Sequence, residues 1–486
     1  MEALSVREIA KAVDGIILSG DENTQITSVS TNSKNMESKA LFVPIAGERV
    51  DAHDFIEDAF ANGAAACFTS RHTDTVEKTD KVYIKVADTL KALQVLGTFY
   101  RSRFDIPVIG ITGSVGKTTT KEMVAAALAT KYNVLKTDGN MNSQVGLPLM
   151  MLRINAEHDI AVIEMGMSEE GEMEKLAVIA KPETAIMTNI GVSHIAQLKT
   201  RENIRREKLN IINCFQKDSV LFINGNDDLL SKLYKDNNTP LTNLNLCEKT
   251  REKYLTAKVT AFGTEEFCDY RAENIQTMNG ETHFILRKKQ DKDSGLYGDG
   301  EEIVLSVLGM HNVFNALAAL AVAEQYNIPV SIAKAGLYEY RPIAMRGQII
   351  EANQVKIIDD SYNASPDSMK SGIHVLLELD GITRRIAVLA DVWELGELSG
   401  QLHYDVGAYI ADQKIDEVIT IGKEAYHIAK AIQDKKADIV THTFSNNQEV
   451  ITYLSEHLKA GDGVLIKGSR GMKTDEIVKA ISKGTI

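Results

Sequence analysis

Residues 110–122 read GITGSVGKTTTKE. The apolar stretch PVIGITG at 107–113 predicts a short strand that enters this segment, and the alanine-rich stretch at 118–132 predicts a helix that leaves it. A strand that enters a helix through a glycine-spaced turn predicts a phosphate-binding loop, because backbone N–H groups and the positive end of the helix dipole then face the anion. We therefore expect a nucleotide site centred on this stretch.

The residues of the turn suggest their roles. Gly113 and Gly116 allow the backbone to turn inward, Lys117 can reach the outer phosphates, and the Thr118 hydroxyl can ligate Mg²⁺. The general phosphate-loop pattern has a glycine where this chain has Ile111, so the loop is the tighter T-G-x-x-G-K-T form. An ordinary glycine-rich turn is the alternative, but it leaves the lysine and threonine unexplained. We expect phosphate contacts from Gly113, Ser114, Val115, Gly116, Lys117, Thr118 and Thr119.

Strands and helices continue to alternate after the loop. The apolar stretches at 159–166, 184–191 and 219–225 predict buried strands, so we expect a parallel sheet with helices on both faces. A long helix is expected at 311–326, and the polar residues 286–302 predict an exposed hairpin or loop.

Two smaller α/β units flank this region. The first has expected strands at 40–47 and 64–70 and an expected helix at 54–64. The last resembles a Rossmann unit, but no G-x-G-x-x-G follows its first strand, so a dinucleotide cofactor is not expected. The predicted fold class is α/β with three domains: a small N-terminal domain, a central phosphate-loop ATPase domain with a parallel sheet, and a Rossmann-like C-terminal domain. We place their boundaries at 1–84, 85–342 and 343–486, with a hinge near Pro342.

Composition narrows the class of protein. The chain has 486 residues, of which 44% are hydrophobic and 25% charged, as in soluble globular proteins. A net charge of −13 argues against general nucleic-acid binding. No apolar run predicts a membrane span, and the N-terminus lacks the apolar core of a signal peptide. Four scattered cysteines favour a reducing compartment over a zinc knuckle or a disulfide framework.

Three polar residues that follow the loop, two near strand ends and one on an expected helix, are candidates for chemistry. Glu164 ends a predicted strand beside the loop and is suited to Mg²⁺, although a salt-bridged strand end would look the same. His194 alone would more often be a packing or hydrogen-bonding histidine, and Lys208 alone would more often be a solvated lysine. The sequence pattern by itself leaves these alternatives open.

Taken together, T-G-x-x-G-K-T, E-M-G, N-I-G-x-x-H and the later lysine resemble the Mur ligase family, the ATP-dependent amide-forming enzymes of peptidoglycan precursor synthesis. The resemblance implies that Thr118, Glu164 and His194 hold Mg²⁺. It also implies that Lys208 is carbamylated and that its new carboxylate helps to bind a second Mg²⁺. The family often has a glutamate two residues after this lysine, where this chain has Asn210.

Motifs further along the chain extend the resemblance. GMHNVFNALAALA at 309–321 implies that Asn312 contacts adenine, and MRGQ at 345–348 implies that Arg346 reaches the phosphates or the ribose. In DDSYNASPDSM at 359–369, Asp360 would hold the ribose. The residues expected to line the cleft after it are Tyr362, Asn363 and Ala364. This D-D-S-Y-N-A form resembles the branch that adds D-alanyl-D-alanine, because branches that add single amino acids usually have histidine in place of Asn363.

The resemblance also supplies substrate contacts. ADVWELGELSGQLH at 390–403 resembles the branch's signature, in which the acids Asp391 and Glu394 can position an incoming ammonium and Leu395 is a further expected substrate contact. The later K-G-S-R implies that Lys467 faces a carboxylate or a phosphate. Residues 31–55 resemble the region that binds the uridine diphosphate end, and 139–148 resemble a conserved loop of the family. The implied contacts there are Ser33, Phe42, Gly47, His53, Asn140 and Asn142.

The resemblance thus implies a ligase that uses ATP and two Mg²⁺ ions. It would join D-alanyl-D-alanine to UDP-N-acetylmuramoyl-tripeptide through an acyl phosphate, as a cytoplasmic monomer that binds neither nucleic acid nor membrane. The implied catalytic residues are Lys117, Glu164, His194, Lys208 and Asp391. The alternatives are a ligase of the same fold with a single amino acid or another carrier as substrate, a phosphate-loop kinase or NTPase, and a nucleotide-binding scaffold without turnover.

Overall fold

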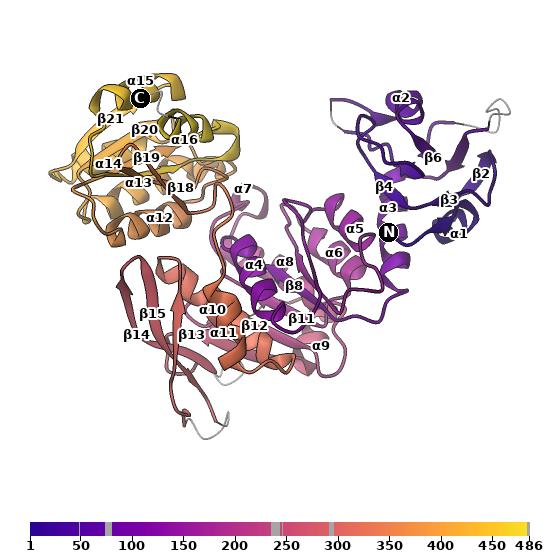
Figure 1. Cartoon of the computed structure of the whole chain (residues 1–486), viewed down its shortest axis with the longest axis horizontal. Helices are drawn as coiled ribbons and strands as arrows, with labels where there is room; N and C mark the ends of the chain where they lie inside the picture. Colours follow the sequence, from indigo (N-terminus) through magenta and orange to yellow (C-terminus); the bar gives the residue numbers. More distant parts are fainter. Residues whose placement is uncertain (48, 73–79, 235–243, 245, 291–295, 484–486) are drawn as a thin grey trace.

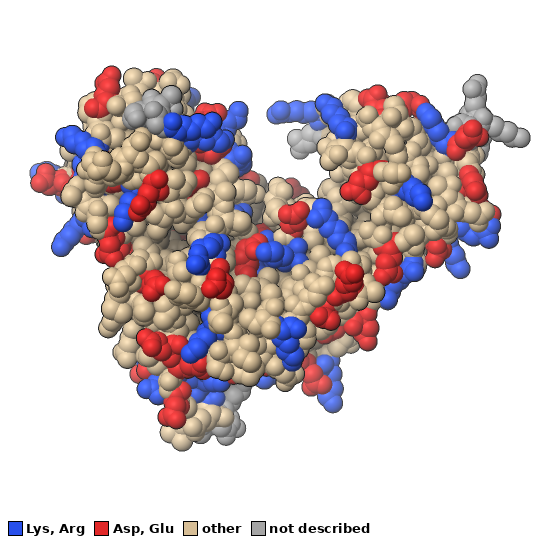
Figure 2. Space-filling model, in the orientation of Figure 1, with Lys and Arg blue, Asp and Glu red and all other residues tan. Residues whose placement is uncertain are grey.

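The computed structural model describes residues 1–47, 49–72, 80–234, 244, 246–290 and 296–483. Three lobes follow one another along the chain, and the N-terminal and C-terminal lobes stand on opposite ends of the central one (Figure 1). The space-filling view shows an open hollow between the two outer lobes (Figure 2). The expected α/β fold with three domains is confirmed. Among the described residues, no helix is both long enough and apolar enough to cross a bilayer.

The N-terminal lobe contains a mixed five-stranded sheet in the order β2-β7-β6-β5-β4, and a two-stranded ribbon of β1 with β3. The expected helix at 54–64 is a 3₁₀ turn, η1, followed by a short helix, α2, which ends just before Gly63. The elements are β1 Leu4–Ser5, α1 Val6–Ala12, β2 Ile16–Ser19, β3 Gln25–Ile26, β4 Ser28–Ser30, β5 Ala40–Phe42, η1 Ala52–Phe55, α2 Ile56–Ala61, β6 Ala64–Thr69 and β7 Val82–Lys85.

The central lobe contains a nine-stranded sheet in the order β16-β15-β14-β13-β12-β11-β8-β10-β9. From β9 to β14 all neighbouring strands are parallel, as the alternating pattern predicts. The elements are α3 Thr89–Arg101, β8 Val108–Thr112, α4 Lys117–Leu128, β9 Val134–Lys136, α5 Gly146–Met151, β10 Ile160–Glu164, α6 Glu172–Ala180, β11 Thr184–Met187, α7 Ile195–Leu198, α8 Arg201–Leu209, η2 Asn210–Ile212, β12 Val220–Asn224, η3 Ser231–Leu233, α9 Glu248–Thr256 and β13 Lys258–Gly263.

The rest of the central lobe extends this sheet in antiparallel fashion. The expected hairpin or loop at 286–302 is the far end of the pair β15 and β16, with residues 291–295 outside the described residues. Helices α4 and α10 pack against each other on one face of the sheet, where their aliphatic residues form a buried cluster. The elements are β14 Tyr270–Met278, β15 Glu281–Lys288, β16 Glu301–Leu305, α10 Met310–Gln325 and α11 Val330–Tyr338.

The C-terminal lobe has a six-stranded sheet in the order β17-β18-β22-β19-β20-β21, parallel except for the β17–β18 hairpin. Its elements are β17 Gln348–Ala352, β18 Val355–Asp359, α12 Pro366–Glu378, β19 Arg384–Ala390, η6 Gly396–Leu398, α13 Ser399–Ile410, β20 Glu417–Ile421, α14 Tyr426–Asp434, β21 Val440–Phe444, α15 Asn447–His457, β22 Asp462–Lys467, η7 Arg470–Met472 and α16 Asp475–Ser482.

Candidate active site

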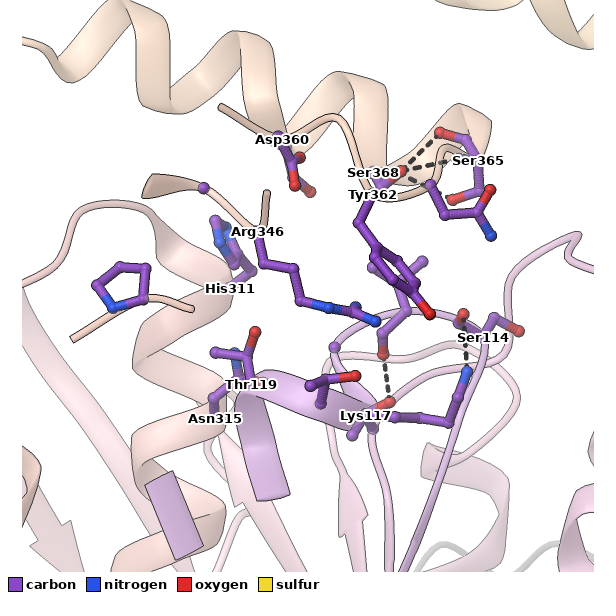
Figure 3. A pocket seen from close by; sticks show the side chains of 18 of the residues that line it. Ser114, Lys117, Thr119, His311, Asn315, Arg346, Asp360, Tyr362, Ser365 and Ser368 are labelled. Atoms are coloured by element: carbon purple, nitrogen blue, oxygen red, sulfur yellow. Dashed lines mark hydrogen bonds between the residues drawn. The ribbon is translucent and has the colours of Figure 1, made fainter. Parts of the chain in front are cut away.

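A cavity of about 850 Å³ lies between the central and C-terminal lobes. The central lobe supplies the phosphate loop (residues 113–119) as its floor, and the C-terminal lobe supplies the segment that begins at Arg346 as its roof (Figure 3). The sequence predicts that these two regions meet at a nucleotide, and the structure brings them together.

The phosphate loop takes its shape from two glycines. Gly116 has a φ of 84° and caps the N-terminus of α4, a backbone conformation that costs glycine little. A Cβ atom at Gly113 would lie 1.9 Å from Oγ1 of Thr188, so a side chain at that position cannot fit beside β11. The first N–H groups of α4 have no partner within the helix and face the mouth of the loop.

Two lysines converge on the carbonyl oxygen of Gly113. Nζ of Lys117 lies 2.7 Å from it, and Nζ of Lys208 lies 3.1 Å from it. Lys208 is almost fully buried at 1% exposure. Burial lowers the pKa of Lys208 well below its usual value, and the neighbouring Lys117 lowers it further. The pKa of Lys117 is lowered as well, chiefly by burial. Lys208 is therefore a buried amine with a reduced tendency to carry a proton, not a solvated lysine.

Glu164 sits at the end of β10, below the first turn of α4. One carboxylate oxygen accepts a 2.8 Å hydrogen bond from the Thr118 hydroxyl, and the other accepts a 2.6 Å bond from the amide of Asn142. The Thr137 hydroxyl accepts a bond from the Glu164 backbone N–H. The pairing of Thr118 with Glu164 gives two hard oxygen donors beside the phosphate loop.

This donor set fits a magnesium ion that is shared with phosphate. No group of three or more His, Cys, Asp or Glu side chains suited to a metal occurs among the described residues. Mg²⁺ commonly uses only one or two protein ligands and takes its others from phosphate and water. A site of Thr118 and Glu164 meets that requirement without a complete cage of protein ligands.

His194 lines the same cavity and also contacts the other lobe. Its Nδ1 lies 2.7 Å from a carboxylate oxygen of Glu394, in the loop before η6. The His194 side chain lowers the pKa of Glu394. The structure thus places Glu394 against His194, whereas the resemblance placed it against the substrate ammonium.

The C-terminal lobe contributes a cation and a carboxylate to the cavity. The Arg346 guanidinium lies 3.9 Å from the centre of the Tyr362 ring and extends toward the phosphate loop (Figure 3). Asp360 lines the cavity, and its carboxylate pairs with Lys467 at 2.5 Å. Lys467 also donates a 3.0 Å hydrogen bond to the Asn363 carbonyl. Lys467 therefore braces the segment that carries Asp360, and the carboxylate that it meets belongs to its own domain.

Several other expected contacts line the cavity. Asn312 does so, but its amide donates to the carbonyl of Leu308 and its oxygen accepts from Asn315. The remaining cavity-lining residues of the expected set are Ser114, Val115, Gly116, Thr119, Asn140, Asn142, Asn363 and Ala364.

Four expected contacts are occupied elsewhere in the structure. Oδ1 of Asp391 accepts hydrogen bonds from the backbone N–H groups of Glu424 and Ala425, just before α14, and the expected role of this carboxylate against substrate stays a prediction. Leu395 is buried at 3% exposure in the hydrophobic core. In the N-terminal lobe, Phe42 is fully buried in a hydrophobic cluster.

His53 is the fourth of these. Its Nδ1 lies 2.6 Å from Asp51, and its Nε2 accepts a bond from the Ser70 backbone N–H, so both ring nitrogens have partners within the lobe. Ser33 and Gly47 remain accessible on the surface of the N-terminal lobe, away from the cavity.

Two asparagines that help to build the site, Asn189 and Asn315, were not predicted as site residues. The side-chain oxygen of Asn189 accepts hydrogen bonds from the N–H groups of Ser114 and Val115 and thereby fixes the phosphate loop. Asn315 accepts a 2.8 Å bond from Thr120 and so ties α10 to α4. Asn189 lies in the motif T-N-I-G and Asn315 in H-N-V-F-N. In each motif a polar amide stands among apolar residues, and this was the signal from which their structural roles could have been predicted.

Comparison with known proteins agrees with this architecture. Three family models match the chain: "Mur ligase family, catalytic domain" over 25–101, "Mur ligase middle domain" over 111–323, and "Mur ligase, glutamate ligase domain" over 345–470. The UDP-N-acetylmuramoyl-tripeptide–D-alanyl-D-alanine ligase of Bacillus subtilis is 37% identical over 478 residues, which cover 98% of this chain and 97% of that protein.

Solved structures show the same likeness. A crystal structure of MurF from Acinetobacter baumannii superposes with a TM-score of 0.85 at 28% identity and covers 99% of both chains. MurF ligase from Thermotoga maritima in complex with ADP gives a TM-score of 0.78 at 29% identity and covers 94% of this chain and 97% of that one. The chain belongs to the Mur ligase family.

Proposed function

We propose that this protein is an ATP-dependent carbon–nitrogen ligase that joins D-alanyl-D-alanine to UDP-N-acetylmuramoyl-tripeptide in peptidoglycan precursor synthesis. The observation that carries the proposal is the single cavity that unites the phosphate loop of one lobe with Arg346 and Asp360 of the other. A kinase or simple NTPase gives no reason for the second lobe to supply these groups. The relatives named above support the choice of substrates.

The first step faces an electrostatic obstacle, which the site is built to overcome. A peptide carboxylate attacks the γ-phosphate of ATP, ADP leaves, and an acyl phosphate forms. Both reactants are anions, so the positive groups around the phosphate must offset their repulsion. Lys117, Arg346 and the N–H groups at the start of α4 supply this charge from two directions.

In the second step, the amine of D-alanyl-D-alanine attacks the acyl carbon. The amine nitrogen loses a proton, the tetrahedral intermediate collapses, and phosphate leaves with the former carboxylate oxygen. Water would hydrolyse the acyl phosphate, so the cavity must be closed during the reaction. The connection between α11 and β17, which contains Pro342, is where we expect the C-terminal lobe to hinge.

Mg²⁺ bound to Thr118 and Glu164 would neutralise the charge that develops on the phosphate oxygens. His194 lines the same cavity and is proposed as a further ligand. We propose that Lys208 is carbamylated, because a buried amine with a lowered pKa is a nucleophile toward CO₂. The product carries a carboxylate, which is suited to a second Mg²⁺. We further propose domain boundaries near 84 and 342, a cytoplasmic location and a monomeric state.

One experiment tests the function. ADP release from ATP is followed with UDP-N-acetylmuramoyl-tripeptide alone, with added D-alanyl-D-alanine, and with added single amino acids. We expect sustained release only with the dipeptide. Release that needs only a single amino acid would assign the chain to another branch of the fold, and release without any amine would favour a simple NTPase.

A further inference from the structure

We propose that Glu394 is a positioning residue, which orients the imidazole of His194 from across the domain interface. The inference rests on the proposed role of His194 at the nucleotide site. It gives Glu394 a role that differs from the substrate contact implied by its sequence motif.

The contact lies where the two lobes meet. The Glu394 carboxylate lies 2.7 Å from Nδ1 of His194, and the Glu394 carbonyl accepts a 3.4 Å backbone hydrogen bond from Ala196 in α7. A Cβ atom at Gly396 would lie 3.1 Å from Cβ of Ala196, so the backbone of the C-terminal loop rests directly on α7. The carboxylate therefore reaches His194 only when the lobes are docked.

The backbone conformations of His194 and Glu394 support a functional role for their contact. His194 has a φ of 63° and Glu394 has a φ of 66°, both in the left-handed region that residues with a side chain rarely adopt. Such a conformation is unfavourable for a residue with a Cβ atom, because Cβ then approaches the following carbonyl oxygen. Strain of this kind persists where the surrounding structure holds the residue in place, and it is concentrated at functional sites.

The two nitrogens of the His194 ring have different surroundings. Nδ1 is inaccessible to solvent and makes no hydrogen bond with the described residues, and the charged group that it faces is the Glu394 carboxylate at 2.7 Å. The ring as a whole lines the cavity. A carboxylate beside Nδ1 favours the tautomer with its proton there, which leaves the Nε2 lone pair free. Carboxylates orient metal-binding histidines in this way in many proteins. Glu394 itself does not line the nucleotide cavity, so its carboxylate acts there only through His194.

The proposal has a consequence for catalysis. If Glu394 orients His194, the nucleotide site is complete only after the C-terminal lobe has docked. ATP would then be activated only in the closed enzyme, from which water is excluded. Loss of such an outer carboxylate typically lowers metal affinity or activity by about 10- to 100-fold.

The test uses the full chain with the variants Glu394→Ala, Glu394→Gln, His194→Ala and the double variant Glu394→Ala/His194→Ala. Glu397→Gln is the matched control, because Glu397 is an exposed glutamate in η6, three residues further along the chain. Calorimetry measures the Kd of a non-hydrolysable ATP analogue with Mg²⁺ and with EDTA. Circular dichroism verifies that each variant is folded, and steady-state assays give kcat and KM.

We expect Glu394→Ala to raise the Kd at least tenfold with Mg²⁺ and to leave the Kd in EDTA within twofold of wild type. We expect a smaller effect for Glu394→Gln, no effect for Glu397→Gln, and a double variant no weaker than His194→Ala alone. Additive effects in the double variant, or equal weakening with and without Mg²⁺, would overturn the proposal. Because these binding measurements need no amine substrate, they stand even if the proposed acceptor is wrong.

Discussion

Gly191 provides a direct test of domain docking. A Cβ atom at this position would lie 2.4 Å from a carboxylate oxygen of Asp367, at the start of α12 in the C-terminal lobe. Carbon and oxygen normally approach to about 3.3 Å, so in Gly191→Ala the exposed Asp367 side chain must turn away or the lobes must separate by roughly 0.9 Å at this point. Separation of the lobes would also lengthen the 2.7 Å contact of Glu394 with His194, a few residues away.

The size of the effect follows from this clash. Overpacking of a close contact costs about 1–3 kcal/mol, which would lower the equilibrium constant for docking by about 5- to 150-fold, and because the exposed Asp367 side chain can turn away we expect the low end of this range. If only the docked state reacts, kcat/KM should fall by the same factor. Gly191 is not among the glycines with positive φ, so alanine introduces little strain into the central lobe itself. The melting temperature should therefore change little.

A compensating variant separates this mechanism from local damage. Asp367→Ala removes the carboxylate that the new methyl group would meet, so Gly191→Ala/Asp367→Ala should recover most of the lost kcat/KM. The Cβ atom of Ser114, 3.3 Å from the same position, limits the recovery to a partial one. ADP release gives kcat/KM, and small-angle X-ray scattering with bound nucleotide reports docking. Wild-type activity in Gly191→Ala, or the absence of any rescue, would refute the reasoning.

Four further predictions concern individual residues. Gly113→Ala should weaken nucleotide binding at least tenfold by calorimetry, because its Cβ would lie 1.9 Å from Thr188 Oγ1; unchanged affinity would contradict the proposed shape of the loop. Lys208→Ala should lower kcat by roughly 10²-fold or more, and wild-type activity should fall in CO₂-depleted buffer and return with bicarbonate. Retained activity without CO₂ would argue against carbamylation. His53→Ala should destabilise the N-terminal lobe by about 1–3 kcal/mol in urea unfolding, because it leaves buried polar partners unsatisfied, and should leave nucleotide affinity unchanged. Burial lowers the pKa of His311 to about 4, whereas an unfolded histidine titrates near 6.5, so stability should fall as pH drops through this window and His311→Gln should flatten that dependence in thermal melts.

The central lobe could be predicted from sequence where its signals are local. The phosphate loop and strands β8, β10, β11 and β12 appear as continuous apolar runs bounded by turn residues, as buried parallel strands should. Strands β14 and β15 were not anticipated. Their residues alternate between buried and more exposed positions. The polar side chains at the more exposed positions interrupt the apolar ones, so these strands contain no continuous apolar run and their sequence resembles that of a loop.

Site residues were harder to assign, because residue type does not reveal the partner. Asp391 was expected to meet an ammonium, but it accepts from N–H groups before α14. His53 was expected to contact a ligand, but Asp51 and Ser70 occupy both of its nitrogens. Each of these functions depends on a neighbour that only the folded chain supplies. The same applies to Gly191, whose importance rests on Asp367 in a different domain.

The turn after β11, residues 188–196, links these observations. Asn189 fixes the phosphate loop, Gly191 admits Asp367, and His194 meets Glu394. One short segment therefore contacts both the nucleotide-binding loop and the docked lobe. A displacement of the loop by phosphate would be transmitted through Asn189 to the surface on which the C-terminal lobe rests. Nucleotide binding and docking should then be thermodynamically coupled, and linkage requires the coupling to be equal in both directions. Gly191→Ala, which weakens docking, should therefore weaken nucleotide binding by at most the factor by which nucleotide favours docking.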